Sequence, residues 1–341
     1  MEFQGACLLR ASLASLAGKN DPAEWKMLVL DEEQTRAALP WPELIEAIAA
    51  MFAGECVMPV RHHHDMDVPG EESATLLLMP AWVPGLYAGV KAVSVFPGNV
   101  RRSLPAISGT YLLSSGATGE MLAVIDGGEL TARRTAAASA LAARYLARPD
   151  AEEMLVCGTG RLSLNLMLAH GTIRPIKRYR IWGRTEQAAE KIAAEARAFG
   201  LDAEATADRE AAARTADIIS CATLSGEPLI SGEWLKPGAH LDLVGAFKPS
   251  MRESDDEAIR RASVHVDTRA GATSEAGDIV QPLKSGVLRL SDIKSELAEL
   301  VSGAHGGRSH DAEITLFKSV GAALEDLAAA ILAYETVAGR K

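Results

Sequence analysis

Short apolar runs and alternating patterns dominate the first part of the chain. Met27–Leu30 is an apolar run that predicts a strand, and a helical pattern follows at about 41–53. Apolar and β-branched residues then recur in segments bounded by Gly, Pro and Asp, which predicts a strand-rich unit with antiparallel or mixed pairing. The strands of this unit are expected at 57–65, 74–80, 87–96, 106–114 and 120–125.

A different rhythm begins after an Ala-rich run at 131–146, which has almost no helix breaker and predicts a long connecting helix. Beyond it, short apolar strands alternate with helices, the pattern of a doubly wound parallel sheet. Strands are expected at 154–157, 178–182, 218–221, 240–244 and 264–266, and helices at 162–169 and 186–199. Residues 313–339 predict one amphipathic helix that returns to the first unit and makes that unit discontinuous.

The predicted fold class is therefore α/β, with a Rossmann-type doubly wound domain plus a discontinuous α+β domain. We place the α+β domain at 27–132 and 312–341, the connecting helix at 133–150 and the Rossmann domain at 151–311. Residues 1–26 are weakly patterned and are predicted to be an N-terminal extension.

Composition and charge narrow the class of protein. Of 341 residues, 48% are hydrophobic and 23% are charged, the balance of a globular chain with a sizeable core. The net charge is −10 and no local basic patch offsets it, so neither nucleic acid nor an anionic membrane is expected as a partner. No apolar stretch reaches the roughly 18 residues that span a bilayer. Arg10 interrupts the first apolar stretch, which argues against a secretory signal, and we expect a cytoplasmic protein.

A glycine turn between a strand and a helix indicates a dinucleotide site. The strand at 154–157 runs directly into Gly158-Thr159-Gly160-Arg161-Leu162-Ser163. The first glycine permits a tight turn, the second lets the backbone approach a pyrophosphate, and the start of the helix offers free N–H groups. Ser163 replaces the usual Gly or Ala and is still small. A glycine-rich turn without a ligand is the alternative interpretation.

The end of the next strand indicates which nucleotide is bound. A site for NAD(H) places an acid there to bond the ribose 2′-hydroxyl, but this strand ends with Trp-Gly followed by Arg184 and Thr185. A guanidinium and a hydroxyl suit a 2′-phosphate, which predicts NADP(H) and leaves NAD(H) possible. The residues predicted to bind the cofactor further include Thr223, Val244, Gly245 and Ser319.

Three cations stand in unusual surroundings and are candidates for holding an anionic substrate: Arg61, Lys91 and Arg134. Lys91 interrupts an otherwise apolar strand, so it would need an anion if it were buried. The alternative is a lysine at a strand end whose amino group reaches water.

From Met27 onward, nearly the whole chain resembles the ornithine cyclodeaminase and mu-crystallin family, because six segments typical of that family occur in the same order. They are Pro-x-Arg at 59–61, the Lys91 strand with Phe-Pro-Gly-Asn at 96–99, Leu-Thr-x-x-Arg-Thr-Ala-Ala at 130–137, the Gly-Thr-Gly turn, Trp-Gly-Arg-Thr at 182–185 and Glu-Ile-Thr-Leu-Phe-Lys-Ser-Val-Gly at 313–321. The resemblance implies a homodimer, with a substrate-binding and dimerisation domain built from both chain ends. It also implies that Arg61, Lys91 and Arg134 bind the substrate carboxylate.

Phe247 distinguishes between branches of this family. Deaminating members carry an Asp shortly after a Gly-rich strand end, whereas the matching segment here places Phe247 at that position, with Asp242 nearby. An aromatic ring cannot accept a proton or orient water, which disfavours ornithine cyclodeamination. The segment resembles the branch that reduces Δ1-pyrroline-2-carboxylate and Δ1-piperideine-2-carboxylate. In that reaction the three cations, with Phe247 beside the substrate, would hold the ketimine for hydride transfer to C2.

His62, His63 and His64 are consecutive and do not predict a metal site, because alternate strand residues point to opposite faces. His63 shares a face with Arg61 and is a candidate proton donor to the imine nitrogen; an ordinary surface or core histidine is the alternative. The four cysteines, Cys7, Cys56, Cys157 and Cys221, lack paired spacing and predict neither disulfides nor zinc.

Two other activities remain open at the level of sequence. One is an amino-acid oxidoreductase, either an ornithine cyclodeaminase or an enzyme like alanine dehydrogenase, which the products formed from alanine, ornithine and proline would distinguish. The other is a non-catalytic, NADP-dependent binding protein of the mu-crystallin type, against which the three intact cations argue.

Overall fold

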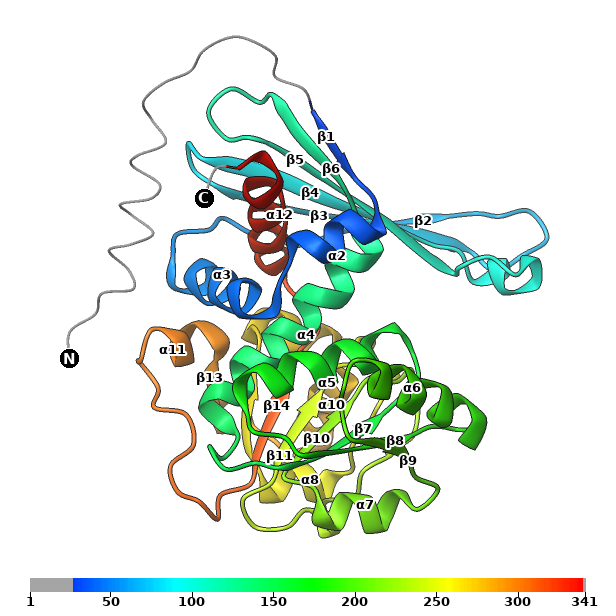
Figure 1. Cartoon of the computed structure of the whole chain (residues 1–341), viewed down its shortest axis with the longest axis vertical. Helices are drawn as coiled ribbons and strands as arrows, with labels where there is room; N and C mark the ends of the chain where they lie inside the picture. Colours follow the sequence, from blue (N-terminus) through cyan, green and yellow to red (C-terminus); the bar gives the residue numbers. More distant parts are fainter. Residues whose placement is uncertain (1–26, 340–341) are drawn as a thin grey trace.

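The structure is a computed structural model that describes residues 27–339, so the predicted N-terminal extension and Cys7 lie outside the described residues. Two sheets organise the chain, one above the other in Figure 1. Helix α4 (Gly127–Leu146) connects them and is buried along most of its length. The Asp126 side chain caps its first turn by accepting a hydrogen bond from Glu129 N at 2.7 Å.

Within residues 27–339, the first sheet has six strands in the order β1-β6-β5-β4-β3-β2. Its strands are β1 (Leu28–Leu30), β2 (His62–Met66), β3 (Ala74–Val83), β4 (Tyr87–Val95), β5 (Ile107–Ser115) and β6 (Met121–Asp126). The β1–β6 pair is parallel and the other pairs are antiparallel. One face packs against α4, α2 (Glu32–Ala38) and α12 (Ala323–Ala338), and α3 (Trp41–Ala53) packs against α4 and α12 (Figure 1).

The second sheet, in the same described range, has eight parallel strands in the order β13-β12-β14-β11-β10-β7-β8-β9. These are β7 (Glu153–Cys157), β8 (Arg178–Trp182), β9 (Ala203–Ala205), β10 (Ile218–Cys221), β11 (His240–Leu243), β12 (Ser263–Val266), β13 (Ile293–Glu296) and β14 (Thr315–Lys318). The strands are short and apolar because both faces are covered.

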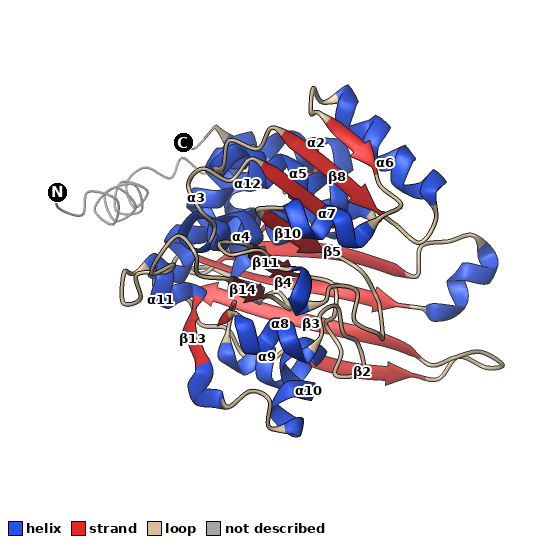
Figure 2. Cartoon of the chain, turned by 90° about the horizontal axis from the view of Figure 1, so that it is seen from below, coloured by secondary structure: helices blue, strands red, loops and turns tan. Residues whose placement is uncertain are grey.

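Helices cover both faces of the second sheet (Figure 2). Apolar side chains of α5 and α6 belong to the large core that extends under the first sheet, whereas those of α7 and α8 belong to a second core on the opposite face. The helices are α5 (Arg161–Ile173), α6 (Glu186–Ala198), α7 (Arg209–Thr215), α8 (Asp256–Arg261), α9 (Arg269–Glu275), α10 (Gly277–Ser285) and α11 (Leu297–Val301), with 3-10 turns η1 (Pro97–Arg102), η2 (Gly232–Trp234) and η3 (Leu290–Asp292).

The predicted α/β fold class is confirmed, and the helix at 41–53 lies where the pattern placed it. The prediction of a single helix at 313–339 is wrong for its first part. Residues 315–318 form β14, which pairs with β11 and β12 in the interior of the second sheet. Gly321, with φ of +81°, then separates β14 from α12. The prediction that the strand of the Pro-x-Arg segment covers 57–65 is also wrong in its bounds: β2 covers His62–Met66, and before it Val57 forms only an isolated bridge with Trp82 of β3.

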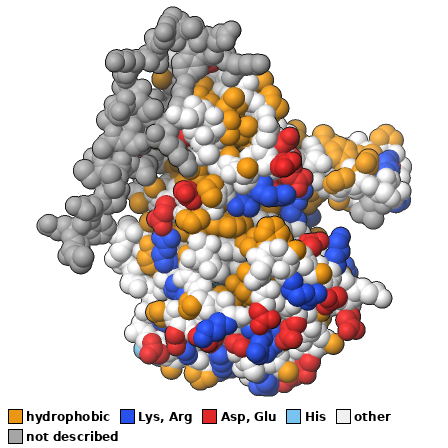
Figure 3. Space-filling view, viewed as in Figure 1, with side chains coloured by type: hydrophobic (Ala, Val, Ile, Leu, Met, Phe, Trp, Pro, Cys, Tyr) orange, Lys and Arg blue, Asp and Glu red, His pale blue; other side chains and the backbone are white. Residues whose placement is uncertain are grey.

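The domain boundaries stay a prediction. The sequence pattern assigns residues 312–341 to the α+β domain, but β14 lies within this range and belongs to the second sheet. In the described part of the chain, every helix is too short or too polar to span the apolar core of a bilayer. Acidic and basic side chains are interspersed over the face seen in Figure 3.

Candidate functional site

The glycine turn after β7 has the geometry of a phosphate-binding loop. Gly158 has φ of +136°, and a Cβ there would lie 2.7 Å from the carbonyl oxygen of Ala222, so a larger residue is excluded. Gly160 is the N-cap of α5 and supplies no side-chain cap, which leaves the first N–H groups of the helix available to an anion. Ser163 Oγ donates to the Gly158 carbonyl oxygen at 2.9 Å, which explains why serine is accommodated in this buried position.

The other predicted residues of this loop lie around the same helix start. Thr159 and Leu162 are partly buried, and Arg161 is exposed. Arg161 Nη2 lies 3.2 Å from Glu32 Oε2, so its guanidinium reaches from the loop to α2.

Arg184 and Thr185 follow β8 at the same edge of the second sheet. Thr185 is the N-cap of α6, and its hydroxyl accepts a hydrogen bond from Ala188 N at 3.3 Å. Arg184 is exposed, and no hydrogen bond or ion pair within residues 27–339 involves its guanidinium. The start of α6 therefore offers a free cation and a hydroxyl side by side.

Glu253, which the sequence analysis did not identify, joins the loops after β10 and β11. Its Oε1 accepts from both N and Oγ1 of Thr223 at 2.7 and 2.8 Å. Its Oε2 accepts from Gly245 N at 2.8 Å and Ala246 N at 3.2 Å. The predicted cofactor residues Thr223 and Gly245 are thus held by one buried carboxylate, while Val244 N donates to Cys221 O between them.

A buried lysine and a second carboxylate lie behind Glu253. Lys318 Nζ is 3.3 Å from Asp278 Oδ2 and 3.9 Å from Glu253 Oε2, and all three residues are fully buried. Burial raises the pKa of Glu253 to about 7, with Lys318 acting against this shift and Asp278 adding to it. Lys318 is the last residue of β14, so the predicted cofactor residue Ser319 follows it directly, and Ser319 N donates to Leu243 O at 3.1 Å.

The three predicted substrate cations come together at the start of α12. Lys91 Nζ and Arg134 Nε each lie 2.8 Å from the same oxygen, Asp326 Oδ1. Arg134 Nη1 also donates to Glu325 Oε2 at 2.7 Å, and Lys91 Nζ donates to Thr131 Oγ1 at 3.2 Å. A buried lysine requires an anion, and Asp326 is the anion that this chain supplies to Lys91.

Arg61 connects this cation cluster to the second sheet. Its Nη2 donates to the Gly321 carbonyl oxygen at 2.6 Å, and its Nε lies 3.3 Å from Glu275 Oε1. A Cβ at Gly321 would lie 2.4 Å from Arg134 Nη1, so the backbone here lies directly against that guanidinium. The N–H of Gly321 donates to Asp267 Oδ2 at 2.8 Å, just beyond the end of β12.

Burial and charge distinguish the members of the cation cluster. The Lys91 side chain is 2% exposed and that of Arg134 is 6%, whereas that of Arg61 is 18% exposed and is the part that solvent reaches. Burial lowers the pKa of Lys91 to about 8, against the attraction of Asp326 and with help from the charges of Arg134 and Arg61. Burial also raises the pKa of Glu325 to about 7, against the attraction of Arg134. Lys91 and Arg134 are paired with the buried carboxylates of Glu325 and Asp326, whereas Arg61 is paired with Glu275, whose side chain is 27% exposed.

Two further candidates lie apart from these contacts. His63 is exposed on β2, the outer strand of the first sheet, where it pairs with Leu77 of β3. Phe247 is 37% exposed on the loop after β11, and Lys248 Nζ lies 6.0 Å from the centre of its ring. Within residues 27–339, no group of three or more His, Cys, Asp or Glu side chains is placed to hold a metal ion.

Asp242, the nearby acid, is not positioned for chemistry on a substrate. It is fully buried in β11, where its carboxylate accepts hydrogen bonds from Ser139 Oγ at 3.0 Å and Ser220 Oγ at 2.6 Å. These contacts tie α4 to the second sheet. The structure therefore leaves Phe247, rather than an acid, at the exposed position after this strand.

Known proteins of similar sequence show the family to which the chain belongs. The model of the ornithine cyclodeaminase/mu-crystallin family matches residues 27–341. A Δ1-pyrroline-2-carboxylate reductase of Paracoccus denitrificans is 34% identical over 302 residues, which cover 88% of this chain and 94% of that protein.

Solved structures show the same likeness. A Δ1-pyrroline-2-carboxylate reductase of Thermococcus litoralis, in complex with NADH and L-proline, superposes with a TM-score of 0.86 at 33% identity, covering 92% of this chain and 98% of that one. An archaeal alanine dehydrogenase dimer with bound NAD superposes with a TM-score of 0.84 at 30% identity, covering 92% and 96% of the two chains.

Proposed function

Because the chain belongs to the ornithine cyclodeaminase/mu-crystallin family, we propose that it is an NAD(P)H-dependent reductase of cyclic ketimine acids. The substrates are Δ1-pyrroline-2-carboxylate, which becomes L-proline, and Δ1-piperideine-2-carboxylate, which becomes L-pipecolate. Similar proteins of this activity, one of them with NADH and L-proline bound, support the assignment.

The observation that carries the proposal is the position of the cation cluster, beside the carboxyl ends of the strands of the second sheet. Arg61, Lys91 and Arg134 surround residues 321–326, which continue from β14 at the same edge as the glycine turn. The substrate carboxylate enters from the side of Arg61, because Arg61 is the most accessible of the three cations and its partner Glu275 is itself partly exposed.

The chain's residues act mainly by holding the reactants in place. The three cations fix the carboxylate, and the adjacent C2 is thereby held in a defined position at the sheet edge. Bound reduced nicotinamide supplies the hydride that C2 accepts. The nitrogen is protonated before the hydride arrives. When C2 accepts the hydride, the C=N bond becomes a C–N bond and its π electron pair moves onto the nitrogen. His63 is the proposed donor of that proton, and Phe247 is proposed to line the substrate.

We propose NADP(H) as the preferred cofactor, with NAD(H) as a second one. The turn at Gly158 and Gly160 and the uncapped start of α5 fit a pyrophosphate, with Thr159, Arg161 and Leu162 around it. Arg184 and Thr185 fit a 2′-phosphate. Thr223, Val244, Gly245 and Ser319 are proposed to contact the nicotinamide half, on the loops that Glu253 holds together.

We further propose that the protein is a cytoplasmic homodimer. The dimeric alanine dehydrogenase of similar structure supports the assembly, as does the helix-free face of the first sheet. Among the described residues, Cys157 and Cys221 are buried free thiols, which suits a reducing compartment.

The test is an assay of the purified full chain with NADPH or NADH and each ketimine. We expect oxidation of the cofactor together with formation of proline or pipecolate, resolved by chiral chromatography. Δ1-Pyrroline-5-carboxylate is the matched control, because its carboxylate is not attached to the imine carbon. Ammonia release from ornithine, or turnover of alanine without ketimine reduction, would transfer the assignment to the amino-acid oxidoreductases. Cofactor binding with no turnover of any imino acid would favour a binding protein.

A further inference from the structure

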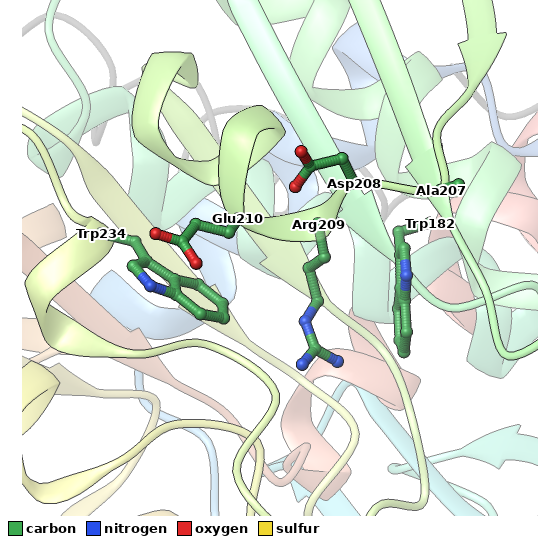
Figure 4. Close-up of a pocket in the computed structure, with 6 residues that line it drawn as sticks. All are labelled: Trp182, Ala207, Asp208, Arg209, Glu210 and Trp234. Atoms are coloured by element: carbon green, nitrogen blue, oxygen red, sulfur yellow. The ribbon is translucent and has the colours of Figure 1, made fainter.

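An open hollow of about 560 Å³ lies beside the proposed cofactor edge (Figure 4). Trp182 is the last residue of β8, and Trp234 is the last residue of η2. Between them lies the first residue of α7, Arg209. The lining residues are Trp182, Ala207, Asp208, Arg209, Glu210 and Trp234.

Two indole rings hold Arg209 in this hollow. Its guanidinium carbon lies 4.4 Å from the ring centre of Trp182 and 5.7 Å from that of Trp234 (Figure 4). Cation–π contact fixes the side chain while leaving its N–H groups unused. The Nε atom is buried and has no hydrogen-bond partner, and no ion pair within residues 27–339 involves this guanidinium.

The carboxylates that line the hollow are engaged elsewhere. Asp208 caps α7 by accepting from Ala211 N at 2.9 Å. Glu210 Oε1 accepts from Arg214 Nη2 at 2.7 Å and from Arg214 Nε at 2.9 Å. Packing of α7 against β7 and η2 brings Arg209 to the rings, but it does not explain a desolvated N–H without an acceptor. Nη1 and Nη2 also have no acceptor among the described residues, and unlike Nε they are not enclosed, so an anionic ligand with several oxygens can accept hydrogen bonds from them.

Strand pairing places this arginine on the loop next to the one that carries Arg184. Thr206 N donates to Ile181 O at 2.9 Å, so the segment leading to α7 runs alongside the segment leading to α6. Arg184 and Arg209 therefore come from neighbouring loops at one edge of the sheet. Both have guanidinium groups without an acceptor among the described residues.

We propose that Arg209 is a specificity-determining residue that binds the 2′-phosphate of NADP(H) together with Arg184, with the hollow receiving the adenosine end. This inference rests on the cofactor part of the proposed function. Two guanidinium groups from adjacent loops can donate to different oxygens of one phosphate. The single 2′-hydroxyl of NAD(H) cannot accept both sets of hydrogen bonds.

The experiment compares two fragments that differ in the 2′-phosphate alone, adenosine 2′,5′-bisphosphate and adenosine 5′-monophosphate, by calorimetric titration of the full chain. Arg209→Met should weaken binding of the bisphosphate about tenfold or more, the size of one hydrogen bond to a charged group. Binding of the monophosphate should not change. Arg178→Met, at the opposite end of β8, is the matched control. Arg209→Lys, which keeps the charge, should fall between wild type and Arg209→Met.

Equal losses for both fragments would show that Arg209 contacts the base or ribose, and no loss for either would show that it only packs α7; both results overturn the inference. The fragments carry no nicotinamide, so the result does not depend on ketimine reduction. Failure of the proposed activity with retained bisphosphate discrimination, or the reverse, separates the two proposals. Circular dichroism of each variant confirms that it is folded.

Discussion

Lys91 is the residue of the cation cluster whose charge can change within the pH range of an ordinary assay. Burial is the largest cause of its low pKa, about 8, and the positive charges of Arg134 and Arg61 add to the shift while Asp326 opposes it. A guanidinium would stay charged throughout this range. Lysine therefore makes anion binding at this position dependent on pH.

Binding of a planar carboxylate that does not titrate near neutrality, such as pyrrole-2-carboxylate, should weaken about tenfold between pH 7 and pH 9, since the competent, protonated fraction falls by that factor. Lys91→Arg should abolish this dependence even where its overall affinity is lower. Calorimetric titration at several pH values measures both. Lys177→Arg on the surface is the control. The same slope in wild type and Lys91→Arg would contradict the role assigned to Lys91.

The weaker anion binding at high pH cannot result from a loss of stability caused by Lys91. In the folded chain the pKa of Lys91 is about 8, lowered from 10.5, so between these values the unfolded chain binds more protons. The contribution of this group to the free energy of unfolding therefore rises with pH in that window, while its contribution to anion binding falls.

At the scale of elements, Glu253 joins two loops that come from different strands. Its two oxygens receive four hydrogen bonds from residues after β10 and β11, and it is fully buried. We therefore assign Glu253 as a positioning residue for the proposed nicotinamide half of the cofactor site.

Glu253→Gln should raise the cofactor dissociation constant more than tenfold and lower the free energy of unfolding by about 2–4 kcal/mol, because one amide NH₂ then faces backbone donors. The KM for the ketimine should change less, since the cations are untouched. Fluorescence titration with NADPH and urea unfolding measure the two effects. Glu257→Gln, partly exposed on α8, is the control. Lost stability with unchanged cofactor affinity would reduce Glu253 to a structural role.

Comparison of particular elements shows what the sequence could predict. Strands and helices with their own periodicity, such as the helix at 41–53, were predicted. By contrast, the pattern predicts helix where β14 forms, because Leu316, Val320 and Leu324 also fit helical spacing. The pairing of β14 with β11 and β12 depends on residues far away in sequence.

The same contrast holds for the candidate site. Arg61, Lys91 and Arg134 could be found because a cation in an apolar segment requires an anion. Their partners could not, since Glu325 and Asp326 in the first turn of α12 resemble the acids that begin many helices. Arg209 carried no sequence signal, because its two tryptophan neighbours come from other elements.

At the scale of the whole molecule, the first sheet has an apolar face that no helix of the described chain covers. The helices contacting its strands lie on the side of Met79, Tyr111 and Ile125. Side chains alternate between faces, so the paired neighbours of these residues form a row across the strands on the opposite face. This row consists of Pro80, Val90, Leu112, Val124 and Val29.

A second copy of the chain is the proposed partner for this row, because an uncovered apolar sheet face of this extent is unstable in water. Leu112→Arg places a charge at its centre and should convert the dimer to a monomer by light scattering, since an unpaired buried charge opposes association. Phe199 is 61% exposed at the end of α6, so Phe199→Arg should leave the mass of the dimer unchanged. A Leu112→Arg protein that stays dimeric would show that the two copies meet through another surface, and the exposed edge of β2 would be the next to test.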